Sequence, residues 1–204
     1  MKLLLGTKNK NKIIEMTRIL KESLSNLELE IISLKDLNDV EEPIEDGNTF
    51  SENAVLKAKY YYDIFKIPTI ADDSGISVNA LDGRPGIYSA RYASTTNENS
   101  SSKANRDKLL DELKDENDRS AYYTCAIALY YGDSYIVTED YTYGKILFEE
   151  VGTNGFGYDF IFHSTELNKP LSVATDEEKD SISHRAKAIK KLIELINEQK
   201  STKL

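Results

Sequence analysis

The amino-acid sequence predicts an α/β fold in which helices flank a mixed sheet, built as a single domain over residues 1–204. Helical and strand-like segments alternate in the first half of the chain, and a strand hairpin and a closing helix occupy the second half. That order of elements is typical of a mixed sheet with helices packed on it. Since no internal repeat or long flexible linker divides the chain, we expect no independent second domain.

The N-terminal segment is predicted to alternate strand, helix and strand. Three leucines at residues 3–5 are typical of a short buried strand. A helix is expected from about Lys10, because apolar side chains recur about one turn apart after it. Residues 30–34 have the composition of a second strand, and the acidic segment 36–46, which contains a proline, is predicted to be a loop.

The next helix, at residues 50–65, has the clearest sequence signature. Thr49 and Glu52 have the spacing of a capping box, in which each side chain bonds a backbone N–H at the helix start. Apolar residues then recur at intervals of three and four, so one stripe of the helix is expected to face the core.

An acidic turn is expected between two further strands. Residues 67–71 are mostly apolar and end at the adjacent carboxylates Asp72 and Asp73, which lead into a turn at Gly75. The alternation over residues 76–80 indicates that another strand follows. Both carboxylates are therefore predicted to lie at a strand end.

A mobile loop, a helix and a hairpin are predicted next. The polar run at residues 94–102 is expected to be the loop, and the helix after it contains Leu109. Residues 122–131 and 135–143 are rich in β-branched and aromatic side chains. A Gly-Asp-Ser turn joins these two runs, which predicts a β-hairpin.

A glycine-rich loop at residues 152–157 precedes a predicted strand at 160–162. Glycines let the backbone come close to a ligand, and in such a loop Phe156 is able to stack on a planar ring while Asp159 accepts from a ring N–H. A tight hairpin corner needs the same glycines, so the residues alone leave both interpretations open.

The last helix is predicted to begin near Ser183. His184 and Arg185 then lie in its first turn, shortly after Lys179, although cations at a helix N-terminus oppose the helix dipole. Such a local conflict is expected at a functional site. A packed or surface histidine explains His184 equally well.

Composition narrows the class of partner. The net charge of −9 argues against a nucleic-acid polymer or an anionic membrane, while a local lysine cluster is still able to bind a small phosphorylated ligand. No apolar stretch approaches the roughly 18 residues of a membrane span, and we expect a soluble, cytoplasmic protein. Cys125, the single cysteine, lies in an apolar run and is predicted to be buried.

A lysine-rich turn before the first helix is one candidate site. A helix start presents free N–H groups and the positive end of the dipole, and both favour anions. The predicted phosphate cradle comprises Thr7, Lys8, Asn9, Lys10, Asn11 and Lys12. A solvated turn is the alternative, and the segment lacks the glycine spacing of a P-loop.

The adjacent carboxylates Asp72 and Asp73 are a second candidate. Two charges so close repel one another and lose hydration when buried, so a bound cation such as Mg²⁺ would explain them. Adjacent strand residues point to opposite sides, so one carboxylate is expected to face the metal and the other to be held by backbone donors or a lysine. A surface turn is the alternative. Residues 73–75 also match the aspartic-protease triplet, but that chemistry needs two such aspartates.

Lys57 and Glu45 form a third candidate group. Lys57 lies one turn after Asn53 on the helix at residues 50–65, beside its apolar stripe, and Glu45 lies in the loop before that helix. A lysine that extends to solvent past the core is the alternative.

Six motifs follow one another along the chain: Thr7-x-Asn9-x-x-Lys12, Gly47-x-Thr49-Phe50-x-Glu52-Asn53-Ala54, Ala71-Asp72-Asp73-Ser74-Gly75, Pro85-Gly86-x-Tyr88-Ser89-Ala90-Arg91, Gly155-Phe156-Gly157-Tyr158-Asp159 and Ser183-His184-Arg185. In this order and spacing they resemble the inosine/xanthosine triphosphate pyrophosphatase family, from Leu4 to about Arg185. Two positions depart from the family. Lys8 stands where a small residue or glycine is usual, and Phe160 replaces a common proline.

The resemblance implies an elongated protein of two lobes with a nucleotide cleft between them, working as a homodimer. It also implies Mg²⁺-dependent hydrolysis of deaminated purine nucleoside triphosphates (dITP, ITP, XTP and dXTP) at the α–β bond, giving a monophosphate and pyrophosphate. A related enzyme acting on modified pyrimidine triphosphates and a nucleotide-binding sensor without turnover are the alternatives.

Residue roles are implied by the same resemblance. Asp73 is expected to activate water and to share the metal with Glu45, and Asp72 to support that site. The lysines expected to neutralise phosphate are Lys12, Lys57 and Lys179. The substrate-binding residues implied are Thr7 to Lys12, Ser74, Phe156, Gly157, Tyr158, Asp159, Lys179, His184 and Arg185, with residues 156–159, 184 and 185 holding the base.

Overall fold

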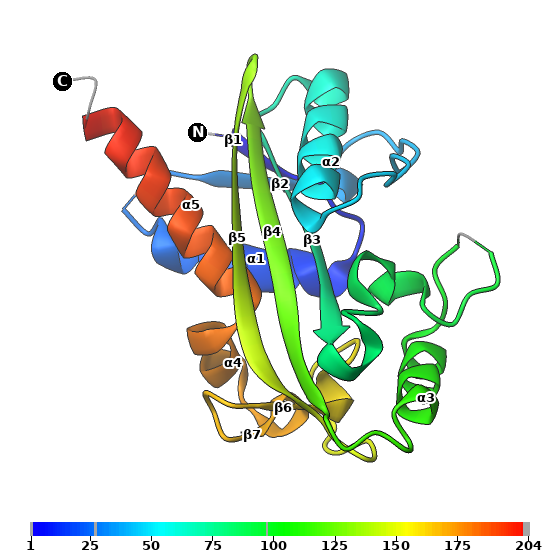
Figure 1. The fold of residues 1–204 in the computed structure, drawn as a ribbon. Helices are drawn as coiled ribbons and strands as arrows, with labels where there is room; N and C mark the ends of the chain where they lie inside the picture. The colour runs from blue at the N-terminus through cyan, green and yellow to red at the C-terminus, as the bar shows by residue number, and fades with distance from the viewer. Residues whose placement is uncertain (1, 27, 97, 202–204) are drawn as a thin grey trace. The chain divides into compact units, whose positions relative to one another are not determined.

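The computed structural model describes residues 2–26, 28–96 and 98–201 (Figure 1). Its α-helices are α1 (Lys10–Ser23), α2 (Phe50–Phe65), α3 (Ser102–Glu112), α4 (Asp176–Ile182) and α5 (His184–Ser201). Its strands are β1 (Lys2–Leu5), β2 (Glu30–Ser33), β3 (Thr69–Val78), β4 (Ser120–Tyr131), β5 (Ser134–Ile146), β6 (Phe162–Ser164) and β7 (Lys169–Pro170).

Among the described residues, seven strands form one sheet in the order β2-β1-β3-β4-β5-β6-β7. β1 pairs in parallel with both β2 and β3. β6 pairs in antiparallel fashion with β5 and with β7. β4 and β5 are the long neighbouring arrows of the hairpin in Figure 1. The mixed sheet flanked by helices that the sequence predicts is confirmed.

The chain divides into two compact units. The first comprises the described residues of Met1–Asp73, Cys125–Asp140 and Arg185–Leu204, and the second comprises those of Ser74–Thr124 and Tyr141–His184. The chain passes between the units within β3, β4 and β5 and at the residue that opens α5. The single domain of two lobes expected from the sequence stays a prediction.

In the first unit, strand alternation sends side chains to both faces of the sheet. On one face, a core joins the sheet to α1 and α5 and includes Leu3, Leu5, Met16, Ile70, Cys125, Ile127 and Ile189. On the face that α2 covers lie two further clusters, one of Ala54, Ala58, Ala71, Ala126 and Ala128 and the other of Leu4, Leu34 and Tyr61. Since consecutive strand residues face opposite ways, Asp72 continues the side of Ile70, and Asp73 continues the side of Ala71.

The second unit has its own hydrophobic core. The strand ends and the hairpin contribute to it, together with α3 and the short helical turns near the glycine-rich loop. Its buried members include Ile76, Val78, Leu109, Leu113, Tyr123, Ile146, Tyr158, Ile161 and Phe162. Tyr158 therefore ties the glycine-rich loop to this core.

The predicted acidic turn is wrong. β3 runs unbroken through Asp72, Asp73 and Gly75, and the two aspartates are only 1% and 7% exposed. Adjacent carboxylates are common in turns, and nothing nearby in the sequence reveals the cations that make their burial possible. The strand then ends at Val78, so Ala80 lies in a 3₁₀ turn rather than in the strand predicted for it.

Only half of the predicted capping box of α2 forms. Thr49 Oγ1 accepts a hydrogen bond from the Glu52 N–H at 3.1 Å. The Glu52 carboxylate reaches past Thr49 and accepts from the N–H of Asn48 at 2.7 Å. Both side chains still satisfy N–H groups at the helix start, so the helix begins where the sequence predicts.

Two C-terminal boundaries also differ from the predictions. Phe160 lies in a 3₁₀ turn, and the strand predicted from that residue begins only at Phe162. Ser183 separates α5 from the short helix α4, which the sequence analysis does not predict. The first turn of α4 contains three acidic residues and no periodic apolar stripe, which explains why it gives no clear pattern.

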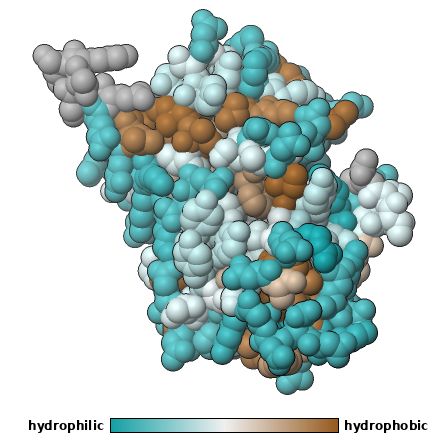
Figure 2. All heavy atoms as spheres, in the orientation of Figure 1, coloured by the Kyte–Doolittle hydropathy of each residue, from teal (hydrophilic) through white to brown (hydrophobic). Residues whose placement is uncertain are grey.

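No helix among the described residues is long and apolar enough to cross a membrane. Figure 2 shows hydrophilic residues over much of the visible face, with hydrophobic residues gathered in brown patches. Large exposed hydrophobic side chains include Ile44, Tyr88, Tyr143 and Phe148.

Cys125 is expected to be unreactive in the folded protein. It is fully buried, and burial raises the pKa of its thiol. Because alkylation requires the thiolate, iodoacetamide at mildly alkaline pH should leave the native chain unlabelled. After denaturation in guanidinium chloride, mass spectrometry should detect one label on this single cysteine. Rapid labelling of the native chain would contradict its burial.

Candidate functional site

The turn before α1 is ordered by its own side chains. Asn9 Oδ1 caps the helix, accepting from the N–H groups of Asn11 at 3.0 Å and Lys12 at 3.3 Å. Thr7 Oγ1 accepts from the N–H of Asn9 at 3.2 Å. The first turn of α1, all of it described, contains no acidic residue. The positive end of this helix is thus not offset by a carboxylate of its own first turn, which favours an anion there.

The lysines of this turn have different partners. Lys8 Nζ donates to the Val40 carbonyl at 2.6 Å and to Asp39 Oδ1 at 3.0 Å, which ties the turn to the acidic loop. Lys12 Nζ lies 3.0 Å from Asp72 Oδ2. Lys10 occupies an exposed position at the start of α1, as does Asn11. The phosphate cradle stays a prediction, and two of its lysines are paired with carboxylates.

Asp72 is held on the side of the sheet that α1 and α5 cover. Arg185 donates to Asp72 Oδ2 from Nη2 at 3.0 Å and from Nε at 3.3 Å. The same guanidinium donates from Nη1 to Glu15 Oε2 at 2.7 Å. Burial alone would raise the pKa of Asp72, but Lys12 and Arg185 lower it well below its usual range. Asp72 is therefore a buried anion held between two cations.

Asp73 is held on the opposite side, by α2. Asn53 Nδ2 donates to Asp73 Oδ2 at 3.1 Å, and Lys57 Nζ lies 3.3 Å from Asp73 Oδ1. Lys57 Nζ also lies 3.1 Å from Glu45 Oε1, so one ammonium joins two carboxylates. Burial raises the pKa of Asp73 even though Lys57 opposes it. Burial would lower the pKa of Lys57, but Asp73 and Glu45 raise it above its usual range. The prediction that the two aspartates point to opposite sides of the strand is confirmed.

Asn53 also fixes the loop that carries Glu45. Its Oδ1 accepts from the N–H of Gly47 at 2.9 Å. A Cβ on Gly47 would lie 2.6 Å from that oxygen and 2.9 Å from the Cβ of Glu52, which is closer than real contacts allow. Glycine is therefore required for the loop to approach the start of α2, where Glu45 meets Lys57.

In the second unit, Asp159 closes the glycine-rich loop on itself. Its Oδ2 accepts from Lys179 Nζ at 2.5 Å and from the N–H of Phe156 at 3.0 Å, and Oδ1 accepts from the Tyr123 hydroxyl at 3.2 Å. Lys179 Nζ also lies 4.6 Å from the centroid of the Phe156 ring. A Cβ at Gly155, where φ is +93°, would lie 2.5 Å from Asp159 Oδ2.

Aromatic rings extend this cluster. The rings of His184 and Tyr123 are stacked, with centroids 4.7 Å apart and an interplanar angle of 6°. The Tyr158 hydroxyl donates to the Ser89 carbonyl at 2.8 Å. Ser74 lies half-buried in β3, at the first position of the second unit.

The predicted site residues thus gather in both units. In the first, Lys12 and Arg185 pair with Asp72 on one side of the sheet, and Lys57 joins Asp73 to Glu45 on the other. In the second, Phe156, Asp159, Lys179 and His184 are linked through Tyr123. Arg185 belongs to the first unit, where it binds Asp72 and Glu15. Its base-holding role, like the phosphate role of Lys179, stays a prediction.

Sequence reasoning missed Glu15 and Tyr123. Glu15 is 4% exposed on α1, next to Met16 of the apolar stripe. A carboxylate there, one helical turn from Lys12, is the signal that an ion-pair network was present. Tyr123 belongs to a hairpin that contains many tyrosines, so no local pattern distinguishes it.

Comparison with known proteins places the chain in a family. Residues 3–195 match the Ham1 family. A dITP/XTP pyrophosphatase of Desulfotalea psychrophila is 44% identical over 188 residues, covering 92% of this chain and 81% of that protein. A protein of the same name from Haemophilus influenzae is 44% identical over 193 residues, covering 92% of this chain and 95% of its own length.

Solved structures give the same result. The Staphylococcus aureus Ham1 protein is 37% identical with a TM-score of 0.82, and the match covers 98% of this chain and 100% of that one. A Ham1 protein from Coxiella burnetii is 34% identical with a TM-score of 0.83, covering 97% and 99%. The chain belongs to the Ham1 family.

Proposed function

We propose that this chain is a nucleoside-triphosphate diphosphatase that removes deaminated purine nucleotides. Its substrates would be dITP, ITP, XTP and dXTP, cleaved at the α–β bond to a monophosphate and pyrophosphate. The observation that carries the proposal is the buried Asp73, oriented by Asn53 and joined to Glu45 through Lys57. Relatives 44% identical to this chain are named dITP/XTP pyrophosphatases, which supports the same substrate class.

Charge neutralisation is the first requirement of this chemistry. Water attacks a polyanion only after the negative charge of the phosphates is offset. In the first unit, Lys12 and Lys57 supply ammonium groups, and the start of α1 supplies the positive end of a helix dipole. We assign phosphate binding to the residues of this unit.

Mg²⁺ fits the donors of the first unit. It prefers oxygen ligands and is usually held by one or two carboxylates together with phosphates and water. The described residues contain no group of three or more His, Cys, Asp or Glu able to hold a metal, so the proposal rests on a pair. Glu45 and Asp73 already share one cation, Lys57. They are the proposed ligands of Mg²⁺, which supplies charge neutralisation and acidifies water when it is bound.

Asp73 is the proposed general base. Asn53 and Lys57 each hold one of its oxygens, so the carboxylate cannot rotate freely. A carboxylate beside Mg²⁺ has a low pKa, so Asp73 would be a weak base, but it would still orient and deprotonate water whose own pKa the metal lowers. In the proposed step, Asp73 takes a proton from water as the water oxygen bonds to phosphorus, and the α–β bridge breaks.

Base selection is proposed for the second unit. A 6-keto oxygen accepts hydrogen bonds, whereas the 6-amino group of adenine would face the same donors with a donor of its own. Such a mismatch costs several orders of magnitude in rate. Phe156, whose ring lies beside Lys179, offers a face for a purine ring to stack on.

The substrate assignment is tested by following product release. We expect pyrophosphate from ITP and XTP in the presence of Mg²⁺, much slower release from ATP, and loss of activity with EDTA that added Mg²⁺ restores. GTP and modified pyrimidine triphosphates complete the panel. Orthophosphate as the product, or equal rates with ATP and ITP, would contradict the proposal.

Replacement of the proposed base should remove turnover. Asp73→Asn keeps the size of the side chain but cannot accept a proton, so kcat should fall by about 10²- to 10⁴-fold. Asp63→Asn on the exposed side of α2 is the matched control, because Asp63 pairs only with surface lysines among the ion pairs of the described residues. Steady-state kinetics with ITP measure both. Full activity of Asp73→Asn would exclude it as the base.

Arg185 is expected to be a stability determinant. Arg185→Met leaves the buried carboxylates of Asp72 and Glu15 without their shared guanidinium, and breaking a buried ion pair in this way costs about 3–5 kcal/mol. Urea unfolding followed by circular dichroism measures this loss. Lys190→Met at an exposed position of α5 should change the free energy of unfolding little. A change below about 1 kcal/mol for Arg185→Met would show that the network adds no net stability.

A further inference from the structure

The two halves of the glycine-rich loop are fastened in different ways. Ser172 accepts at its carbonyl from the N–H groups of Thr153 at 3.3 Å and Asn154 at 3.0 Å, so the first half is tied to backbone. The second half contains Gly155 and Gly157, both with positive φ. Glycines give that half its shape but also make it costly to order. Its backbone therefore needs an additional restraint.

Arg106 supplies that restraint. Its Nη1 donates to the carbonyl of Gly157 at 2.8 Å. Gly157 lies between Phe156 and Tyr158 in the loop. A Cβ at Gly157 would meet nothing within 4 Å, so glycine is needed there for its backbone conformation and not for space. The bond from Arg106 thus restrains the segment at one of its two positive-φ glycines.

Arg106 also binds the chain on both sides of the loop. Its Nε donates to Glu150 Oε1 at 2.9 Å and its Nη2 to Glu150 Oε2 at 3.2 Å, a two-bond contact just before the loop. The guanidinium carbon lies 4.7 Å from the centroid of the Phe160 ring, just after it. One side chain, only 7% exposed, therefore contacts the chain just before the loop, at the loop's last glycine and just after it.

Only a planar guanidinium combines these contacts. Its edge presents several N–H donors in one plane, while its face remains available to an aromatic ring. An ammonium at the same position has no planar face and no fixed fork. Phe160, which replaces a proline common in the family that the motifs resemble, is one of the three groups that Arg106 contacts.

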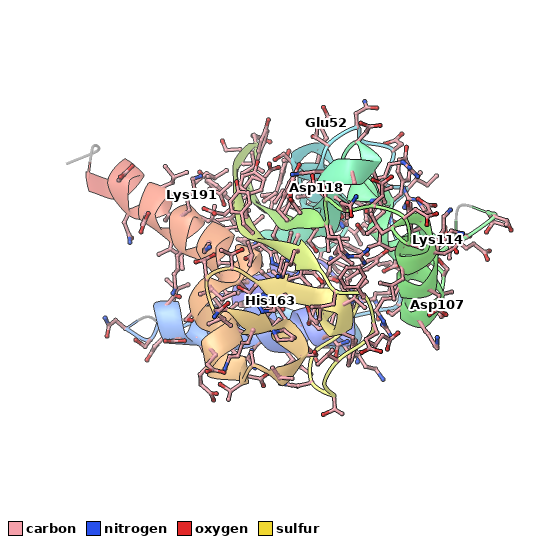
Figure 3. The ribbon with its side chains drawn as sticks, turned by 60° about the horizontal axis from the view of Figure 1, so that its bottom comes forward. Glu52, Asp107, Lys114, Asp118, His163 and Lys191 are labelled. Carbon is pink, nitrogen blue, oxygen red and sulfur yellow. The ribbon has the colours of Figure 1, made fainter. Side chains whose placement is uncertain are left out.

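We propose that Arg106 is a positioning residue that sets the geometry of Phe156 and Asp159 and thereby the recognition of the purine base. It does not touch the reacting atoms. Its helix, α3, begins with Ser101 as N-cap, which accepts from the N–H of Ala104 at 3.2 Å. Figure 3 labels Asp107, which follows Arg106 directly on α3 and marks this part of the helix. The base-recognition part rests on the proposed function, whereas the effect on loop order does not.

The test uses Arg106→Met and Arg106→Lys in the full chain. Displacement of a binding group by about an ångström can cost on the order of a hundredfold in efficiency. We expect Arg106→Met to raise KM for ITP by about tenfold or more and to lower the preference for ITP over ATP, with a smaller change in kcat. Arg106→Lys should recover only part of this, because one ammonium cannot make all three contacts. Lys103→Met, which removes an exposed ion pair of α3 with Asp107, is the control and should behave like the unaltered chain.

Hydrogen exchange supplies a readout that is independent of activity. The amides of Phe156 and Asp159 are bonded within the loop, and both should exchange at least about tenfold faster in Arg106→Met, while those of β4 stay protected. Unchanged exchange together with an unchanged KM would overturn the inference. A fall in melting temperature with both readouts unchanged would show a merely structural role. An unaltered chain that hydrolyses no purine triphosphate would overturn the proposed function and the base-recognition part, while the exchange rates still decide whether Arg106 orders the loop.

Discussion

The burial of two adjacent carboxylates in β3 is the constraint on which the first unit depends. Asp72 and Asp73 take their ion-pair partners from opposite sides of the sheet, because consecutive strand residues face opposite ways. Each side therefore provides its own partners. Arg185 and Lys12 meet Asp72 beneath α1 and α5, and Lys57 meets Asp73 beneath α2. Replacing either set would leave a charge buried without compensation, which costs several kcal/mol, on the order of 3–5.

This division separates structural work from chemical work. The bonds of Asp72 lock α1, α5 and β3 together, and the pKa of that carboxyl is lowered because two cations surround it. Burial raises the pKa of Asp73, and Glu45, on the loop that Asn53 fixes, is joined to Asp73 through Lys57. In the second unit, Asp159 has a comparable anchoring role, since its two oxygens bind Lys179, Tyr123 and the backbone of its own loop.

How much of this arrangement the sequence predicts depends on how far apart along the chain the interacting residues lie. Helices α1 and α2 are predictable because a cap and an apolar stripe lie within a few residues of each other. The pairing of Asp72 with Arg185 spans more than half of the chain, so local patterns place the aspartates in a turn. Glu15 and Tyr123 escape for the same reason, since their partners are remote in sequence. Motif order is the basis of the predicted set of site residues, whereas tertiary contacts alone place Arg185 beside Asp72 and His184 beside Tyr123.

The most direct test of this account compares Asp72→Asn with Asp73→Asn by two measurements on each variant, the free energy of unfolding and kcat with ITP. Asp72→Asn is predicted to lose about 3–5 kcal/mol of stability, since it leaves Lys12 without this buried carboxylate and Arg185 with Glu15 alone. Asp73→Asn is predicted to lose kcat by at least about a hundredfold with a smaller loss of stability. The opposite pattern, in which Asp72→Asn remains fully stable but inactive while Asp73→Asn retains its turnover, would contradict the division of labour between the two carboxylates.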